Sequence, residues 1–142
     1  MKIVAATHVH SEWSYDASWS LSELAYEFGK RGCDAVLMSE HDKGWDKQKW
    51  IEYQQACSAA STSKVLLVPG IEYSDKENIV HVLVWGAADF LGAGLPTACL
   101  LERVRETQAS AVFAHPDRRA AWSVFESDWY TQLLGVEVWN RK

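Results

Sequence analysis

The histidines and two of the glutamates are the residues of this sequence best suited to chemistry, because most of them lie at or near the end of a short apolar run and one histidine, His81, lies within such a run. They are His8, His10, His41, His81, His115, Glu40 and Glu72. A neutral imidazole offers a ring nitrogen, and a carboxylate offers negative charge and oxygens that can bridge two ions. Both suit Zn, Mn or Fe, with Mg as a further candidate. The pattern therefore predicts a cluster of divalent metal ions.

Each histidine also has a plain structural interpretation when it is taken alone. His41 fits a salt-bridged surface residue, His81 a hydrogen-bonded core residue, and His115 a turn before a proline. The His8-Val9-His10 segment is more specific, because alternation along a strand sends both imidazoles to the same side. We favour a shared metal-binding role, because separate structural roles give the 5 histidines of the chain no reason to follow one pattern.

Alternating strands and helices are predicted to position these residues. Apolar runs predict strands over residues 3–6, 35–38, 65–68 resuming at 71–73, 79–85, 111–114 and 136–139. Apolar spacing predicts helices over residues 21–31, 46–60, 97–108 and 127–134, and Ser20 and Glu23 have capping-box spacing at the start of the first. Because helices separate most strands, we expect a mostly parallel sheet or a barrel segment, whose strand ends meet at one rim.

Length and charge limit the classes of protein that this chain can represent. A closed barrel of eight strands and eight helices needs about 250 residues, so a chain of 142 residues cannot hold a complete one. We expect one domain over residues 1–142. The net charge of -5 and the scattered lysines and arginines argue against general binding to duplex nucleic acid.

The distribution of apolar residues and cysteines indicates the cellular setting. No apolar run approaches the ~18 residues of a membrane span, so no membrane partner is expected. Cys33, Cys57 and Cys99 form no Cys-x-x-Cys pair, which favours reduced thiols over a disulfide framework. We therefore expect a cytoplasmic protein, and the sequence leaves its oligomeric state open.

Several of these motifs, in this order, resemble those of the PHP (polymerase and histidinol phosphatase) domain family. The matching segments are Thr7-His8-Val9-His10-Ser11, Ser14-Tyr15-Asp16, Ser39-Glu40-His41-Asp42, Pro69-Gly70-Ile71-Glu72, His81, Ala114-His115-Pro116 and Gly135-Val136-Glu137-Val138-Trp139-Asn140. The resemblance covers the chain from end to end. It implies an α/β fold, a partial distorted (β/α)7 barrel with about six strands present and the last strand missing, and up to three metal ions.

The resemblance also implies which residues hold the ions. His8, His10 and Glu72 would hold the first ion, Glu72, His81 and His115 the second, and Asp16 and His41 would contribute to the third. The sequence departs from the family pattern at two points: Glu40 stands where the family has aspartate, and the family's final Asp-x-His motif has no counterpart before Lys142. That motif completes the first and third sites in the family, so we expect the second site to be the best preserved.

The expected reaction is hydrolysis of a phosphoester on a small phosphorylated metabolite, a nucleotide or an oligonucleotide end. A bound ion lowers the pKa of its water toward ~7 and so supplies hydroxide at neutral pH. Glu72 and His115 are the predicted catalytic residues, and Arg118 is the preferred contact for the substrate phosphate, with Lys43 and Arg119 as further basic residues near the rim. Two alternatives stay open: a metal-binding module with weak or no activity, and another metal hydrolase similar to the amidohydrolases.

The tryptophans offer a second kind of contact with a substrate. Trp13, Trp45 and Trp139 follow the rim motifs, where an indole ring can stack on a nucleobase. We favour packing for all three, because aromatic side chains mainly supply buried area.

Overall fold

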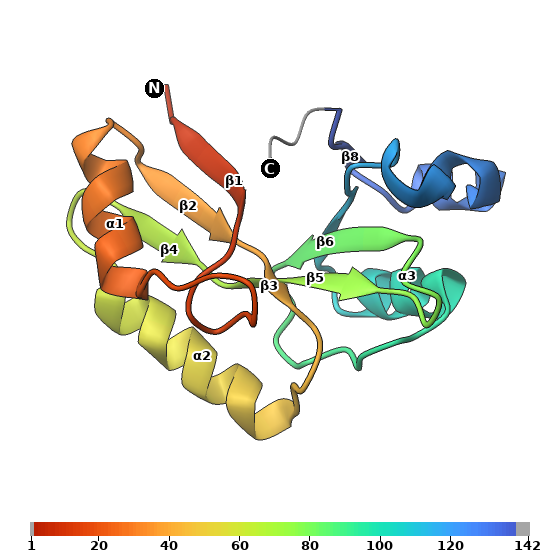
Figure 1. Cartoon of the computed structure of the whole chain (residues 1–142), viewed down its shortest axis with the longest axis horizontal. Coiled ribbons are helices and arrows are strands. Elements are labelled where there is room, and N and C mark those ends of the chain that lie inside the picture. Colours follow the sequence, from red (N-terminus) through yellow and green to blue (C-terminus); the bar gives the residue numbers. More distant parts are fainter. Residues whose placement is uncertain (1, 139–142) are drawn as a thin grey trace.

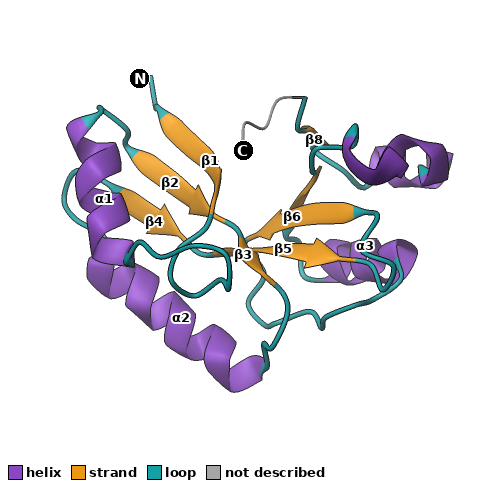
Figure 2. Ribbon diagram, in the orientation of Figure 1, coloured by secondary structure: helices purple, strands orange, loops and turns teal. Residues whose placement is uncertain are grey.

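The computed structural model describes residues 2–138 and arranges their strands in two sheets that lie side by side (Figure 1). The strands are β1 Ala5–Val9, β2 Ala35–Met38, β3 Glu40–His41, β4 Leu66–Val68, β5 Gly70–Ser74, β6 His81–Trp85, β7 Ser110–Phe113 and β8 Gly135–Val136. The α-helices are α1 Leu21–Lys30, α2 Lys47–Ala60 and α3 Thr97–Glu106, and two 3-10 helices, η1 and η2, span Arg118–Val124 and Ser127–Thr131. Figure 2 shows that loops connect most of these elements.

The first sheet is parallel and has the order β1-β2-β4. Helices α1 and α2 pack beside it (Figure 1). The predicted capping box is present, because the Ser20 hydroxyl accepts from the Glu23 backbone N–H while the Glu23 carboxylate accepts from the Ser20 backbone N–H. Asp46 caps α2 by accepting from the backbone N–H of Lys49.

The second sheet has the order β3-β5-β6-β7-β8 and is mixed, although most strand pairs of the described residues are parallel, as expected. Strands β5 and β6 are antiparallel, as are β6 and β7. For β5 and β6 the reason is the length of the connection, since residues 75–80 form a tight turn and a parallel crossover needs about a dozen residues or more. The hairpin places His81 beside the end of β5.

The strand count and the final helix also differ from the sequence-based expectation. Within residues 2–138 eight strands form two open sheets, because the predicted strand over 65–68 and 71–73 divides at Pro69 into β4 and β5, which join different sheets, and because β3 forms a further strand that was not expected. The predicted helix over 127–134 is replaced by the 3-10 turn η2. Aromatic contacts hold this region, since Phe125 and Trp129 pack on Phe113 with ring centroids 5.5 and 6.4 Å away. Trp139, at the end of the predicted last strand, lies outside the described residues.

One buried cluster of apolar side chains connects both sheets with the helices. Alternation along β5 sends Ile71 and Tyr73 into this core and Glu72 to the opposite face. On that opposite face Glu72 lies directly across from Leu83 of β6, which packs with Trp85 in a smaller apolar cluster. The buried floor beneath Glu72 is therefore apolar.

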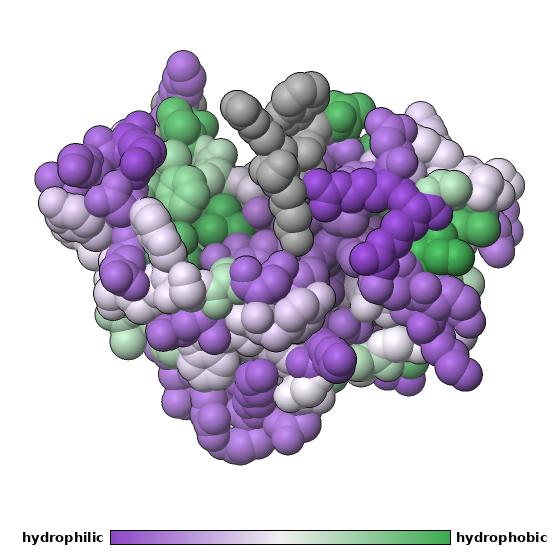
Figure 3. All heavy atoms as spheres, viewed as in Figure 1, coloured by the Kyte–Doolittle hydropathy of each residue, from purple (hydrophilic) through white to green (hydrophobic). Residues whose placement is uncertain are grey.

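The surface and the cysteines complete the description. In Figure 3 hydrophobic surface gathers near the start of the chain, and Ile3 and Val4, which precede the edge strand β1, are among the exposed apolar side chains. Cys33, Cys57 and Cys99 are free thiols, as expected. Within residues 2–138 no helix has both the length and the apolar character required to cross a membrane.

The junction between the sheets depends on Gly70. The Trp85 indole lies over Gly70 and donates a hydrogen bond of 2.7 Å to the Met38 carbonyl of the first sheet. A β-carbon at Gly70 would come within 2.2 Å of Trp85 Cδ1 and 2.5 Å of the Met38 carbonyl oxygen, and the latter is backbone and cannot move aside cheaply.

We expect Gly70→Ala to lower the free energy of unfolding by about 3 kcal/mol, because the new methyl group displaces Trp85 and breaks its hydrogen bond. Urea denaturation followed by tryptophan fluorescence measures the change. Gly135→Ala is the matched control, because a β-carbon there meets no atom within 4 Å. Equal stability of the two variants would contradict the proposed packing.

Candidate metal centre

Glu72 is the centre of the site, and all 5 histidines of the chain surround its carboxylate. The side chain is buried, with 2% of its surface exposed. Oxygen Oε1 lies 2.7 Å from His81 Nδ1 and 2.8 Å from His115 Nε2. Oxygen Oε2 lies 3.1 Å from His41 Nδ1, 3.4 Å from His8 Nε2 and 3.5 Å from His10 Nε2. Motifs spread over more than one hundred residues thus meet at one carboxylate.

The strand register explains this convergence. His41 on β3 is the direct partner of Glu72 in the parallel β3–β5 pair, so both side chains share a face. His81 lies on β6 two residues before Leu83, the residue opposite Glu72, and therefore also shares this face. His115 follows β7, whose end pairs with the start of β6.

Two groups of donor atoms in the described part of the chain are close enough to hold an ion. One is formed by His8, Glu72 and His115, and the other by His10, Asp16 and His41. These groups differ from the sets that the resemblance implies, which unite His8 with His10 and His81 with His115. His81 belongs to neither group. Its Nε2 lies 2.8 Å from Asn78 Oδ1, and its Nδ1 lies 2.7 Å from Glu72 Oε1.

The donor set fits a divalent ion. His10 Nε2 is buried and has no hydrogen-bond partner among residues 2–138, although its ring lies against His41 with centroids 4.5 Å apart. Burial lowers the pKa of His10 to about 4, so its imidazole is neutral at pH 7 and its lone pair is available. Imidazole nitrogens beside carboxylates are the ligands that Zn, Mn and Fe prefer.

The charges at the centre are set by its neighbours. Burial opposes ionisation of Glu72, but hydrogen bonds from His115, His8 and His81 outweigh it and hold the pKa of Glu72 well below its usual range. Burial likewise disfavours a charged His8, but hydrogen bonds to Glu137 and Glu72 raise its pKa to about 9. At pH 7 the centre therefore carries an ionised Glu72 and a protonated His8, and an ion that binds His8 Nε2 replaces that proton.

The backbone at two of the histidines adopts an unusual conformation. His8 has a φ of 58° and His115 a φ of 29°, both in the left-handed region that non-glycine residues rarely occupy. At His8 the β1–β2 register shifts between Ala6 and Val9, so simple strand alternation does not describe the His8-Val9-His10 segment. The two strained residues lie side by side, with ring centroids 5.4 Å apart, as is typical of functional sites.

Glu137 is a residue of the centre that sequence reasoning did not single out. Its oxygens lie 2.9 and 3.0 Å from His8 Nδ1, and Oε2 also accepts the backbone N–H of His115 at 3.1 Å. It follows β8, so it joins the two sheets across the centre. The signal that could have identified Glu137 is the position of a carboxylate directly after an apolar strand.

We expect Glu137→Gln to weaken metal binding about 10- to 100-fold, because the carboxylate orients His8 and makes its other nitrogen a stronger donor. Titration calorimetry with Mn²⁺ measures the affinity. Glu126→Gln, on the exposed segment before η2, provides a control with the same change of charge. Equal Mn²⁺ affinity of both variants would contradict this role.

Glu40 stabilises the centre indirectly, through hydrogen bonds to residues around it. It is fully buried and accepts hydrogen bonds from the Ser11 hydroxyl at 2.6 Å, the Ser14 hydroxyl at 2.5 Å and the Tyr53 hydroxyl at 3.1 Å. The Ser14 hydroxyl also accepts the His41 backbone N–H at 3.0 Å. Glu40 thus anchors the loop that carries His10, and it belongs to neither group of donors.

The basic residues near the centre occupy different positions. Arg118 begins η1 and its backbone N–H bonds to the His115 carbonyl, but its guanidinium makes no ion pair or hydrogen bond with another described residue. The Arg119 guanidinium donates to the Asn78 carbonyl at 2.5 Å. Lys43 lines a cavity beside His41.

Two of the three tryptophans considered for substrate stacking contribute to packing instead. Trp45 is buried, and its ring lies 5.1 Å from Tyr53 and 6.0 Å from Trp13. These contacts belong to the main core. Trp139 lies outside the described residues.

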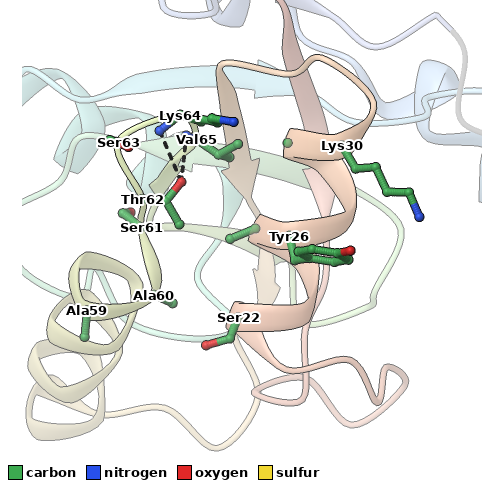
Figure 4. A pocket seen from close by; sticks show the side chains of 12 residues that line it. Ser22, Tyr26, Lys30, Ala59, Ala60, Ser61, Thr62, Ser63, Lys64 and Val65 are labelled. Carbon is green, nitrogen blue, oxygen red and sulfur yellow. Dashed lines mark hydrogen bonds between the residues drawn. The ribbon is translucent and has the colours of Figure 1, made fainter.

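A cavity of about 500 Å³ lies between α1 and the end of α2. Figure 4 shows the side chains that line it. Tyr26, Lys30 and Lys64 are among its lining residues, and no residue of the metal centre lines it. The cavity of about 600 Å³ lined by His41 adjoins the centre. The centre therefore lies beside this second cavity and not beside the one in Figure 4.

Comparison with known proteins supports the fold. No protein-family model and no curated protein sequence matches the chain. A solved two-domain protein from Bacteroides vulgatus ATCC 8482, containing a predicted PHP-like metal-dependent phosphoesterase, matches 96% of the chain at 17% identity and a TM-score of 0.72. A second solved protein, from Bifidobacterium adolescentis ATCC 15703 and described, again by inference, as a metal-dependent phosphoesterase, matches 98% at 13% identity and a TM-score of 0.58.

The matches cover 44% of the first protein and 78% of the second, so the chain spans less than half the length of the first. Sequence identities of 17% and 13% support a shared architecture only. The chain therefore has a mixed α/β fold similar to that of these two solved proteins, with its two sheets open over the described residues.

Proposed function

We propose that this chain is a metal-dependent phosphoesterase that hydrolyses a small phosphorylated metabolite, a nucleotide or an oligonucleotide end. The observation that carries the proposal is the convergence of 5 histidines on the buried carboxylate of Glu72. A set of purely structural histidines has no reason to enclose one ionised carboxylate on an apolar floor.

Different residues of the chain would bind different ions. His8, Glu72 and His115 would hold one ion, and His10, Asp16 and His41 would hold a second. Divalent ions held there would supply hydroxide from bound water at neutral pH and would neutralise the charge of the phosphoryl oxygens. Glu137 keeps the His8 ring oriented, and Asn78 holds His81 against Glu72.

Phosphate recognition is the second part of the proposal. Arg118 starts η1 beside His115, and its guanidinium remains the predicted phosphate contact. The names of the two solved proteins of the same fold favour a phosphoester over an amide substrate. Zn, Mn or Fe suits the imidazole donors better than Mg, which prefers oxygen.

Hydrolysis of p-nitrophenyl phosphate in the presence of Mn²⁺ tests the proposal. We expect turnover by the unmodified chain and a loss of at least about 100-fold in kcat/KM for His115→Ala, because one of the three donors of its group is lost. Gln48→Ala, an exposed substitution on α2, provides the control.

Each result has a clear meaning. Equal rates for His115→Ala and Gln48→Ala would show that the activity arises elsewhere. Tight Mn²⁺ binding without turnover would favour the metal-binding module, and cleavage of p-nitrophenyl acetate without cleavage of the phosphate would favour an amidohydrolase-like enzyme.

A further inference from the structure

A cavity of about 600 Å³ opens directly beside the metal centre. His41 belongs to both, since it lines the cavity and also contacts Glu72 at 3.1 Å and Asp16 at 3.2 Å. Tyr15 stands at the same place, stacked on the His41 ring with centroids 4.8 Å apart and 75% of its surface exposed. A substrate whose phosphate reaches the centre would extend past His41 into this space.

Two lysines supply positive charge to the cavity. Lys43 and Lys76 both line it and both are exposed. Within residues 2–138 the ion pairs of lysine and arginine are Arg31–Glu27, Lys47–Asp89 and Arg105–Glu102, so neither cavity lysine is neutralised by a described carboxylate. Their ammonium groups are available to an anion.

The carboxylate side chains that line the cavity already accept hydrogen bonds from other groups of the protein. The Asp42 side chain accepts from the backbone N–H groups of Ser74 and Gly94, each at 3.3 Å, and from the Ser74 hydroxyl at 3.2 Å. Asp75 Oδ1 accepts from the backbone N–H groups of Ile79 and Val80 at 2.7 and 3.1 Å.

Asp42 also organises the cavity. It is buried, with 4% of its surface exposed, and its hydrogen bonds join three walls: the loop after β3, the end of β5 and the loop before α3. The walls that carry Lys43 and Lys76 are therefore held at a defined separation without a ligand.

We propose that this cavity is a subsite for a second anionic group, so that the preferred substrate carries two phosphates, one at the metal centre and one between Lys43 and Lys76. The inference rests on the proposed phosphoesterase function and adds the substrate class to it. The second phosphate gains charge-assisted hydrogen bonds from both lysines. A substrate with a single phosphate leaves this subsite unused.

Release of phosphate from alkanediol bisphosphates and from the matching monophosphates, with spacers of three, five and seven carbons, measures the preference. We expect kcat/KM to be at least about 20-fold higher for one bisphosphate than for its monophosphate. Lys43→Ala and Lys76→Ala should each reduce this ratio about 5-fold, and the double variant should remove it. Lys47→Ala, whose ammonium is already paired with Asp89, should leave the ratio unchanged.

The outcomes separate the subsite from the proposed reaction. Hydrolysis of the monophosphates at the same efficiency as the bisphosphates would overturn the subsite and leave the phosphoesterase standing. A preference that survives in the double lysine variant would overturn it as well.

A binding measurement covers the case in which no substrate is hydrolysed. Calorimetry on the Mn²⁺-loaded chain then measures its affinity for alkane bisphosphonates and monophosphonates of the same lengths, and this comparison tests the subsite. Tighter binding of a bisphosphonate that is lost in the double lysine variant would support it, and equal affinities would overturn it.

Discussion

Glu72→Gln is expected to reduce kcat/KM for p-nitrophenyl phosphate by about 10³-fold or more, the largest effect of any single substitution in this chain. The carboxylate is the one group that every histidine contacts. The amide that replaces it carries no charge and presents an NH₂ group to nitrogens that need an acceptor. The ion held with His8 and His115 would lose its only anionic ligand in that group.

Two further variants distinguish this effect from simple unfolding. Glu77→Gln removes the same charge from an exposed turn and should keep full activity. Glu72→Asp keeps the charge but shortens the side chain, and it should recover part of the activity. Far-ultraviolet circular dichroism and the Tm confirm the fold of each variant. Activity of Glu72→Gln above one tenth of the unmodified level would rule out the proposed centre.

Removal of metal is expected to lower the Tm of the unmodified chain by about 8 °C relative to the same chain with Mn²⁺ at 100 times its Kd. An ion that binds only the folded state adds about 2.7 kcal/mol at that concentration, and a domain of this size gains about 3 °C per kcal/mol. Among residues 2–138 the centre without metal also leaves the buried His10 Nε2 without a hydrogen bond.

Scanning calorimetry after dialysis against a chelator, followed by addition of Mn²⁺, Zn²⁺, Fe²⁺ or Mg²⁺, measures this effect. Glu72→Gln serves as the control, because it lacks the carboxylate of the group formed with His8 and His115, so its Tm should respond less to the ion. A Tm that is unchanged by all four ions would contradict the metal centre even if phosphatase activity were found.

The local elements were largely predictable from the sequence. The capping box at Ser20, the cap at Asp46 and the strand over Ala35–Met38 depend on neighbours within a few residues, and the structure has all three. The antiparallel hairpin before His81 could also have been inferred, because residues 75–80 are too few for a crossover. The 3-10 turns after His115 could not, because contacts of Phe125 and Trp129 with Phe113 hold them.

For the candidate site, the sequence by itself predicted the chemistry: the residue types and their positions at or near strand ends indicated the histidines and Glu72 as metal donors, and the resemblance added Asp16. The tertiary structure alone decided which donors face one another. It placed His8 with His115, sent His81 toward Asn78 and brought Glu137 to His8. The physical reason is that distances between residues far apart in the chain depend on strand register, on the left-handed backbone at His8 and on the meeting of two sheets at Gly70, none of which follows from local spacing.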